Sequence, residues 1–170
     1  MRRVVFAIFS ILFILMIYFV TLDNEKMMVS LDRCVDGDTA WFSLNGKSIK
    51  VRFLGIDTPE ISDGGNNYSK EALKYSCDKL SNADSIYLEY DDNSDRYDKY
   101  NRMLAWVFVD GANLSELLVR NGYAMVRYVY DDYLYVDDLC KAQSKARNDK
   151  KGIWGINNNS YVKDYCKKNT

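Results

Sequence analysis

The chain has 170 residues, of which 48% are hydrophobic and 14% aromatic, so it can form one compact domain with a substantial core. Its formal net charge of −1 argues against a long polyanion-binding face, but it allows a small site containing a few arginines. The sequence contains no histidine, which excludes histidine-ligated zinc, histidine general bases and Ser-His-Asp triads. A general base must therefore be a carboxylate, a tyrosine, a lysine or water.

The N-terminal residues 4–22 form an apolar run that follows Arg2 and Arg3. A run of this length suits a helix that crosses a bilayer, and no small-x-small cleavage site follows it. We expect residues 1–26 to be a membrane anchor with a short linker, or alternatively a signal segment that is cleaved on secretion. The two arginines favour a cytoplasmic N-terminus, which puts the rest of the chain on the outer face of the membrane.

Four cysteines follow the apolar run, at Cys34, Cys77, Cys140 and Cys166. An outer location permits disulfide bonds, and four cysteines allow three pairings between which the sequence does not choose. Cys34 lies in a strand pattern and Cys77 in a helical pattern, and we favour a bond between these two. The spacing contains no CxxC motif, which argues against a zinc site.

From residue 29 onward, apolar and polar residues alternate in short runs between turn residues, as strands do. Strands are expected over 31–34, 39–44, 48–56, 85–90 and 102–109. The Asn-Gly pair at 45–46 predicts a hairpin between the second and third of them. Helices are expected over 69–80, 113–121 and 133–151, with an extended segment over 124–130.

Five short strands followed mainly by helices do not have the alternating order of βαβ units. They predict an α+β fold, in which a five-stranded Greek-key barrel of the OB type carries about three packed helices. We assign this domain to residues 27–156, and residues 157–170 read as a polar C-terminal tail. Barrels of this type commonly bind nucleic acids on one face.

Three segments carry the residues with the clearest chemistry: 35–39 (Val-Asp-Gly-Asp-Thr), 51–60 (Val-Arg-Phe-Leu-Gly-Ile-Asp-Thr-Pro-Glu) and 98–102 (Asp-Lys-Tyr-Asn-Arg). Taken singly, each has an ordinary structural explanation as a turn, a solvated loop or a salt bridge. Together they place carboxylates and arginines on neighbouring apolar strands. Such a combination indicates metal-assisted cleavage of phosphodiesters.

The expected strand ends would bring Asp38 and Asp57 close together, and two close carboxylates require a cation. A hard dication such as calcium takes carboxylate and backbone carbonyl oxygens, and Thr58 has a suitable carbonyl. Arg52 begins on the opposite face of the strand from Asp57, and a bulge at Gly55 would bring the two side chains to one side. Guanidinium groups match the oxygens of a phosphate.

The three motifs and their order resemble those of the staphylococcal nuclease (thermonuclease) family. The similarity extends over roughly residues 28–155 and includes flanking matches at 104–105, 118–122, 128–130 and 152–154. The resemblance implies an OB-barrel enzyme that hydrolyses DNA and RNA at the 5′-oxygen bond and releases 3′-phosphorylated products. It also implies one Ca²⁺, with Asp38, Asp57 and the Thr58 carbonyl as its protein ligands.

The resemblance assigns the remaining site residues to catalysis and to substrate binding. Glu60 would be the candidate general base for the attacking water, and Arg52 and Arg102 would bind the phosphate and stabilise its developing charge. The residues that would contact a terminal phosphate, the sugar and the base are Lys99, Tyr100, Tyr128 and Tyr130.

Two features depart from the family pattern. Asn101 stands where the family has glycine, and because asparagine tolerates the left-handed backbone region, we expect the turn to be retained. The chain is also acidic, and four aspartates at 131, 132, 137 and 138 would weaken the binding of long polyanions. We expect a monomer that acts on single-stranded or locally melted DNA and RNA. The alternative is a catalytically weak OB module that binds nucleic acid or another partner.

Overall fold

The computed structural model describes residues 26–60, 68–156 and 165–166. The strands in these residues are β1 (Met27–Asp36), β2 (Thr39–Leu44), β3 (Lys47–Phe53), β4 (Ile56–Asp57), β5 (Ile86–Glu89), β6 (Met103–Val109), β7 (Ala112–Asn113) and β8 (Met125–Val126). The helices are α2 (Ser69–Ser81), α3 (Leu114–Arg120), α4 (Val136–Asn148) and the 3-10 helix η1 (Gly152–Gly155).

The expected anchor at 4–22 and most of the expected tail at 157–170 lie outside the described residues. Within the described part of the chain, no helix is both long enough and apolar enough to span a membrane.

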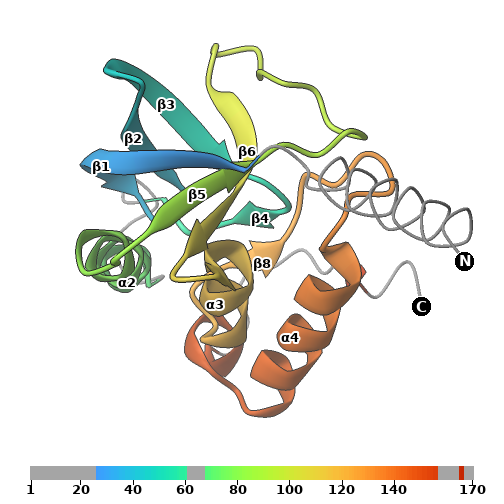
Figure 1. Cartoon of the computed structure of the whole chain (residues 1–170). Coiled ribbons are helices and arrows are strands. Elements are labelled where there is room, and N and C mark those ends of the chain that lie inside the picture. Colours follow the sequence, from blue (N-terminus) through green and yellow to red (C-terminus); the bar gives the residue numbers. More distant parts are fainter. Residues whose placement is uncertain (1–25, 61–67, 157–164, 167–170) are drawn as a thin grey trace, which may run out of the picture.

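Five strands close into a barrel, as the sequence predicted (Figure 1). β1, β2 and β3 form an antiparallel meander, and β5 pairs antiparallel with both β1 and β6. A parallel pairing between β3 and β6 closes the ring. Irregularities in the β1–β2 register allow the long strand β1 to bend and pair with both neighbours. The α-helices α2, α3 and α4 pack outside the barrel, with α3 and α4 side by side.

The hairpin between β2 and β3 forms at the predicted Asn-Gly pair. Asn45 has φ 51° and Gly46 has φ 77°, so both central residues adopt the positive φ that a type I′ turn requires. All pairs from Thr39↔Arg52 to Leu44↔Lys47 are therefore in regular register. This register fixes Arg52 opposite the first residue of β2, next to the Asp-Gly-Asp turn.

The predicted strand 48–56 is wrong at its end, because β3 stops at Phe53 and a turn through Leu54 and Gly55 separates it from β4. Gly55 has φ 73°, and a Cβ at this position would lie 2.9 Å from Leu139 Cδ1 and Trp106 Cη2. Only glycine fits such a conformation in so little space. The turn directs β4 away from the barrel, where it pairs antiparallel with β8.

The β4–β8 ribbon is held by buried polar contacts from two helices. Ser115 at the start of α3 donates its hydroxyl to the carbonyl of Leu54 (3.1 Å). Gln143 of α4 is 1% exposed, and its Oε1 accepts the backbone N–H of Val126 (2.7 Å). Because buried polar groups are costly to leave unpaired, these bonds fix the ribbon against the helices. Helix α4 begins at Val136, three residues later than the sequence predicted.

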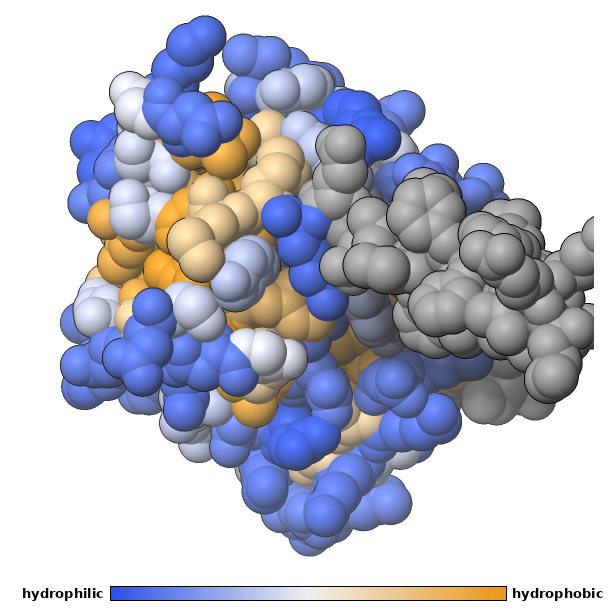
Figure 2. All heavy atoms as spheres, in the orientation of Figure 1, coloured by the Kyte–Doolittle hydropathy of each residue, from blue (hydrophilic) through white to orange (hydrophobic). Residues whose placement is uncertain are grey.

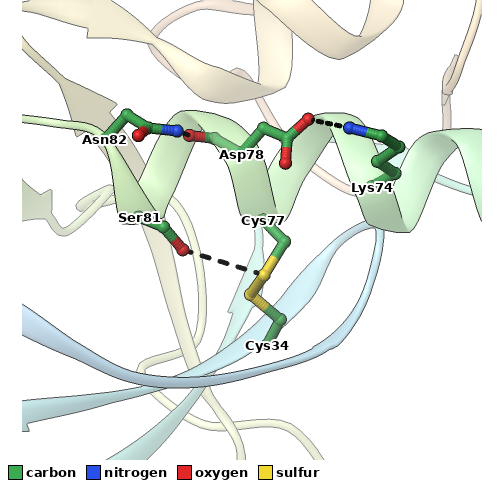
Figure 3. The surroundings of a disulfide bond; sticks show 6 residues. All are labelled: Cys34, Lys74, Cys77, Asp78, Ser81 and Asn82. Atoms are coloured by element: carbon green, nitrogen blue, oxygen red, sulfur yellow. Dashed lines mark hydrogen bonds and ion pairs between the residues drawn. A yellow bond between two sulfur atoms is a disulfide. The ribbon is translucent and has the colours of Figure 1, made fainter.

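Two disulfide bonds join distant parts of the chain. Cys34 of β1 is bonded to Cys77 of α2, and Cys140 of α4 is bonded to Cys166. Figure 3 shows how the first bond attaches α2 to the barrel on the side of the helix opposite the exposed Lys74–Asp78 ion pair. In the view of Figure 2, hydrophobic residues gather over the barrel near β5, whereas mainly hydrophilic residues cover the end that carries α4.

Candidate active site

All ten residues that the sequence assigned to catalysis, metal binding or substrate binding line one cavity of about 700 Å³. They come from the β1–β2 turn, from β3 and β4, from the loop between β5 and β6, and from the segment after β8. These residues are Asp38, Arg52, Asp57, Thr58, Glu60, Lys99, Tyr100, Arg102, Tyr128 and Tyr130. The cavity has a carboxylate side and a side formed by cations and tyrosines.

The Asp-Gly-Asp turn between β1 and β2 builds the carboxylate side. Asp36 Oδ1 accepts the backbone N–H of Asp38 (3.1 Å), as in a common aspartate turn. A Cβ on Gly37 would lie 2.9 Å from the side chains of both Thr58 and Ala72. Glycine therefore allows this turn to lie directly against Thr58 and helix α2.

Asp38 is buried among hydrogen-bond donors. Its Oδ2 accepts both the backbone N–H (2.9 Å) and the hydroxyl (3.0 Å) of Thr58, and its Oδ1 accepts the hydroxyl of Thr39 (3.1 Å). Burial and the neighbouring charge of Asp38 raise the pKa of Asp36 to about 6. Burial of the Asp36 carboxyl is the larger cause of its raised pKa, and the Asp38 carboxylate adds to it.

Arg52 brings the two predicted ligand carboxylates to one point. Its Nη2 lies 3.1 Å from Asp38 Oδ2 and 3.3 Å from Asp57 Oδ1, while its Nη1 donates to the carbonyl of Phe53 (3.1 Å). The sequence argument required a distortion at Gly55 for this meeting, and the turn at Leu54–Gly55 supplies it. The Asp38 and Asp57 carboxylates therefore converge although they come from different strands.

The donor chemistry fits a hard cation. The two carboxylate oxygens meet at Nη2 of Arg52, at 3.1 and 3.3 Å, so a cation would bind both carboxylates beside this guanidinium. Calcium takes six to eight oxygen ligands at about 2.3–2.6 Å. The described residues contain no group of three or more His, Cys, Asp or Glu side chains arranged to hold a metal. Backbone, water or substrate oxygens would therefore complete the coordination of an ion at Asp38 and Asp57.

The 98–102 segment builds the cationic side around the Asp98 carboxylate. Asp98 Oδ2 pairs with Nε of Arg102 (2.6 Å), and Oδ1 accepts the backbone N–H groups of Tyr100 and Arg102 (2.9 Å each). Partial burial raises the pKa of Asp98, but the hydrogen bonds and charge of Arg102 outweigh burial and leave the pKa below its usual value. Asn101 has φ 59°, which confirms that asparagine keeps the left-handed turn.

Exposed tyrosines line both sides of the cavity, since the Tyr128 ring lies 5.7 Å from the guanidinium carbon of Arg52 on the carboxylate side. Tyr100, Tyr128 and Tyr130 are 68%, 44% and 81% exposed, and all three line the cavity. The Tyr100 ring lies 5.0 Å from Lys99 Nζ and 5.4 Å from the guanidinium carbon of Arg102. Exposed aromatic rings beside cations are typical of sites that stack bases and bind the phosphates between them.

Glu60 follows β4 and lies at the cavity wall as an exposed residue. Its position next to the carboxylate side is compatible with contact to a water molecule that approaches a bound phosphate. An exposed carboxylate in this place can accept a proton without disturbing the buried ion pair between Asp38 and Arg52.

Sequence reasoning missed Arg127, whose Nη1 forms an ion pair with Asp57 Oδ2 (2.9 Å). The two residues are 70 positions apart, and no local pattern links them. The available signal was a cation directly before the Tyr-Val-Tyr stretch at 128–130. Asp36, which was not among the ten predicted site residues, also lines the cavity.

The fold and the cavity together define a small OB-barrel domain with a carboxylate–arginine site beside exposed aromatic rings. Residues 50–156 match the family model described as "Staphylococcal nuclease homologue". The chain belongs to the staphylococcal nuclease family.

Curated relatives of the chain carry related names. The chain is 41% identical over 145 residues to the SPbeta prophage-derived endonuclease YokF of Bacillus subtilis. The aligned region covers 83% of this chain and 48% of that protein. It is 40% identical over 137 residues to endonuclease YncB of the same organism, covering 77% of this chain and 64% of the relative. It is 34% identical over 125 residues to the thermonuclease of Staphylococcus hyicus, covering 72% of each. The chain thus spans about half to just under two thirds of the two Bacillus proteins.

Proposed function

We propose that this chain is a calcium-dependent nuclease that hydrolyses phosphodiester bonds of DNA and RNA and releases 3′-phosphorylated products. The observation that carries the proposal is that Asp38 and Asp57 meet at Nη2 of Arg52 in a cavity that also contains Arg102. The names of the relatives, two endonucleases and a thermonuclease, support the same reaction class.

The carboxylate side of the cavity would hold the cation through Asp38, Asp57 and the carbonyl of Thr58. A bound Ca²⁺ would supply positive charge at the phosphate and help to orient a water molecule. Glu60 accepts a proton from the attacking water, because the chain has no histidine and Glu60 is an exposed carboxylate at the cavity wall.

The two cavity arginines act on the phosphate itself. The guanidinium groups of Arg52 and Arg102 stabilise negative charge that accumulates on the phosphate oxygens during the displacement. Asp98 holds Arg102 by Nε and by its backbone N–H, so Arg102 is oriented before the substrate binds. Preorganised donors of this kind need little rearrangement during the reaction.

The exposed tyrosines determine the form of the substrate. A base can stack on Tyr128 or Tyr130 only when it is unpaired, so single-stranded or locally melted nucleic acid fits the cavity best. Lys99 and Tyr100 bind a terminal phosphate at the other end of the bound segment. Stacking and phosphate contacts do not read the sugar, which is compatible with cleavage of both DNA and RNA.

We also propose that the domain works on the outer face of the membrane, anchored by residues 4–22 or secreted after signal cleavage. The two disulfide bonds support this location, because such bonds persist in oxidising compartments and are rare in the cytosol. Protease treatment of intact cells checks the location: degradation of the domain without lysis is expected, and full protection would contradict it.

Incubation of the full-length chain with denatured DNA, with either Ca²⁺ or EGTA, tests the activity. Calcium-dependent release of fragments with 3′-phosphate ends is expected, and Arg102→Ala should abolish most of it. Arg120→Ala is the matched control, since Arg120 is an exposed arginine of α3 that pairs with Glu116. Binding of DNA without cleavage, unaffected by Arg102→Ala, would favour an OB module that only binds nucleic acid.

A further inference from the structure

Asp57 has a second arginine partner that does not belong to the cavity wall. Arg52 Nη2 contacts Asp57 Oδ1 (3.3 Å) from the cavity side, whereas Arg127 Nη1 contacts Asp57 Oδ2 (2.9 Å). Asp57 and Arg52 line the cavity, but Arg127 does not. Arg127 therefore reaches the carboxylate side of the cavity through Asp57.

We propose that Arg127 is a positioning residue that holds the Asp57 carboxylate with Oδ1 toward the cavity, and that it thereby sets the affinity of the site for a divalent cation. The proposal rests on the proposed calcium site and adds a residue to it. It assigns Arg127 no contact with the ion, the substrate or the attacking water.

The backbone of Arg127 is fixed relative to Asp57. Strands β4 and β8 pair Asp57 with Met125, and the backbone N–H of Arg127 donates to the carbonyl of Gly55 (3.0 Å). The bond from Val126 N–H to the buried Gln143 side chain (2.7 Å) holds the same ribbon from the helical side. Arg127 thus approaches Asp57 from a rigid element.

The two guanidinium groups prevent rotation of the Asp57 carboxylate. Each oxygen of Asp57 has a different arginine, so a turn about the Cβ–Cγ bond breaks both contacts at once. The Asp57 side chain is only 13% exposed, which limits the water available to replace either contact. The Tyr128 ring lies 4.9 Å from the guanidinium carbon of Arg127 and restricts the movement of that side chain further.

Two effects of Arg127 on cation binding oppose each other. Its positive charge repels a cation, whereas its hydrogen bond orients a ligand. The Arg127 guanidinium contacts Oδ2 of Asp57, the oxygen farther from the cavity. The Arg127 side chain is 27% exposed, so solvent screens its repulsion of a cation. Hydrogen-bond partners of metal ligands typically change metal affinity by about 10–100-fold. We therefore expect orientation to dominate.

Isothermal titration of the full-length protein with Ca²⁺ alone tests the proposal. Arg127→Met keeps an unbranched stem but has no donor, and it should weaken Ca²⁺ binding by about tenfold or more. Arg127→Lys keeps a charged N–H donor and should stay within about threefold of wild type. Arg120→Met removes an arginine from a different ion pair and should leave the affinity unchanged.

The outcomes separate this proposal from the proposed function. If wild type binds Ca²⁺ and Arg127→Met binds it equally or more tightly, charge repulsion dominates and the positioning role is overturned. Equal weakening in the Lys and Met variants overturns it as well, because the retained donor then has no effect. A wild-type protein that binds no Ca²⁺ overturns the calcium site and the role of Arg127 with it. Thermal melts check that each variant folds. If Arg127→Met does not fold, Arg127→Gln replaces it, because glutamine is too short to keep the contact with Asp57.

Discussion

Replacing Asp98 with alanine removes the carboxylate around which residues 98–102 are arranged. Three donors lose their acceptor, namely the backbone N–H groups of Tyr100 and Arg102 and the Nε of Arg102. A hydrogen bond to a charged group contributes roughly 1.5–3 kcal/mol, but the released donors regain water because the side chain of Arg102 is 23% exposed. We therefore expect the free energy of unfolding to fall by about 2–4 kcal/mol.

The same substitution is expected to reduce activity through Arg102. Without its partner, the guanidinium group is no longer held in one direction, and displacements of about 1 Å in a positioned group cost roughly 10²-fold in rate. We expect kcat on denatured DNA to fall by about this factor, while Ca²⁺ affinity stays at the wild-type value because Asp98 lies on the cationic side. Urea denaturation and titration calorimetry measure the two quantities.

Asp95→Ala is the control, because Asp95 is an exposed carboxylate of the same loop that also lines the cavity. It removes an equal charge and should leave both stability and rate near wild type. If Asp98→Ala retains the wild-type rate and the wild-type free energy of unfolding, the reasoning on the Arg102 clamp is refuted. Equal losses in both variants would show that only the net charge of the loop matters.

Asp98 also predicts a pH dependence of stability. Its pKa is lower in the folded state than the ordinary aspartate value of 3.8. The stabilisation from Asp98 is therefore fully present above that ordinary value and is lost as the pH falls through the lower folded-state pKa. Acid unfolding curves of wild type and Asp98→Ala should converge at low pH, and a constant separation across the acid range would contradict the assignment.

Three further substitutions test other parts of the structure. Glu60→Ser should keep Ca²⁺ binding but lower kcat by about 10²–10⁴-fold, and an undiminished rate would remove Glu60 from the mechanism. Replacing Cys34 and Cys77 together with alanine opens a loop of 43 residues and should lower the free energy of unfolding by about 4 kcal/mol, measured by urea denaturation; a loss below about 1 kcal/mol would contradict the loop-entropy argument. Gly55→Ala should destabilise the protein by about 1–3 kcal/mol more than Gly46→Ala in thermal melts, because both positions have positive φ but only Gly55 is tightly packed, and equal losses would mean that packing does not matter there.

The sequence by itself determined the local features of this protein. The alternating patterns predicted the barrel strands, the Asn-Gly pair predicted the hairpin at 45–46, and Asn101 was expected to keep a left-handed turn. These features depend on residue periodicity and on turn chemistry within a few positions. The three ordered motifs and the flanking match at 128–130 also contained every cavity residue that the resemblance assigned, because each of these segments is continuous in sequence.

The tertiary structure alone decided the contacts between distant segments. The turn at Gly55 depends on the packing of Trp106 and Leu139, and the ion pair of Arg127 with Asp57 depends on the pairing of β4 with β8. No period or turn signal specifies such partners, since their energies are realised only after barrel and helices have packed. The sequence therefore determined which residues carry the chemistry, and the packed fold decided how Asp57 is held between two arginines.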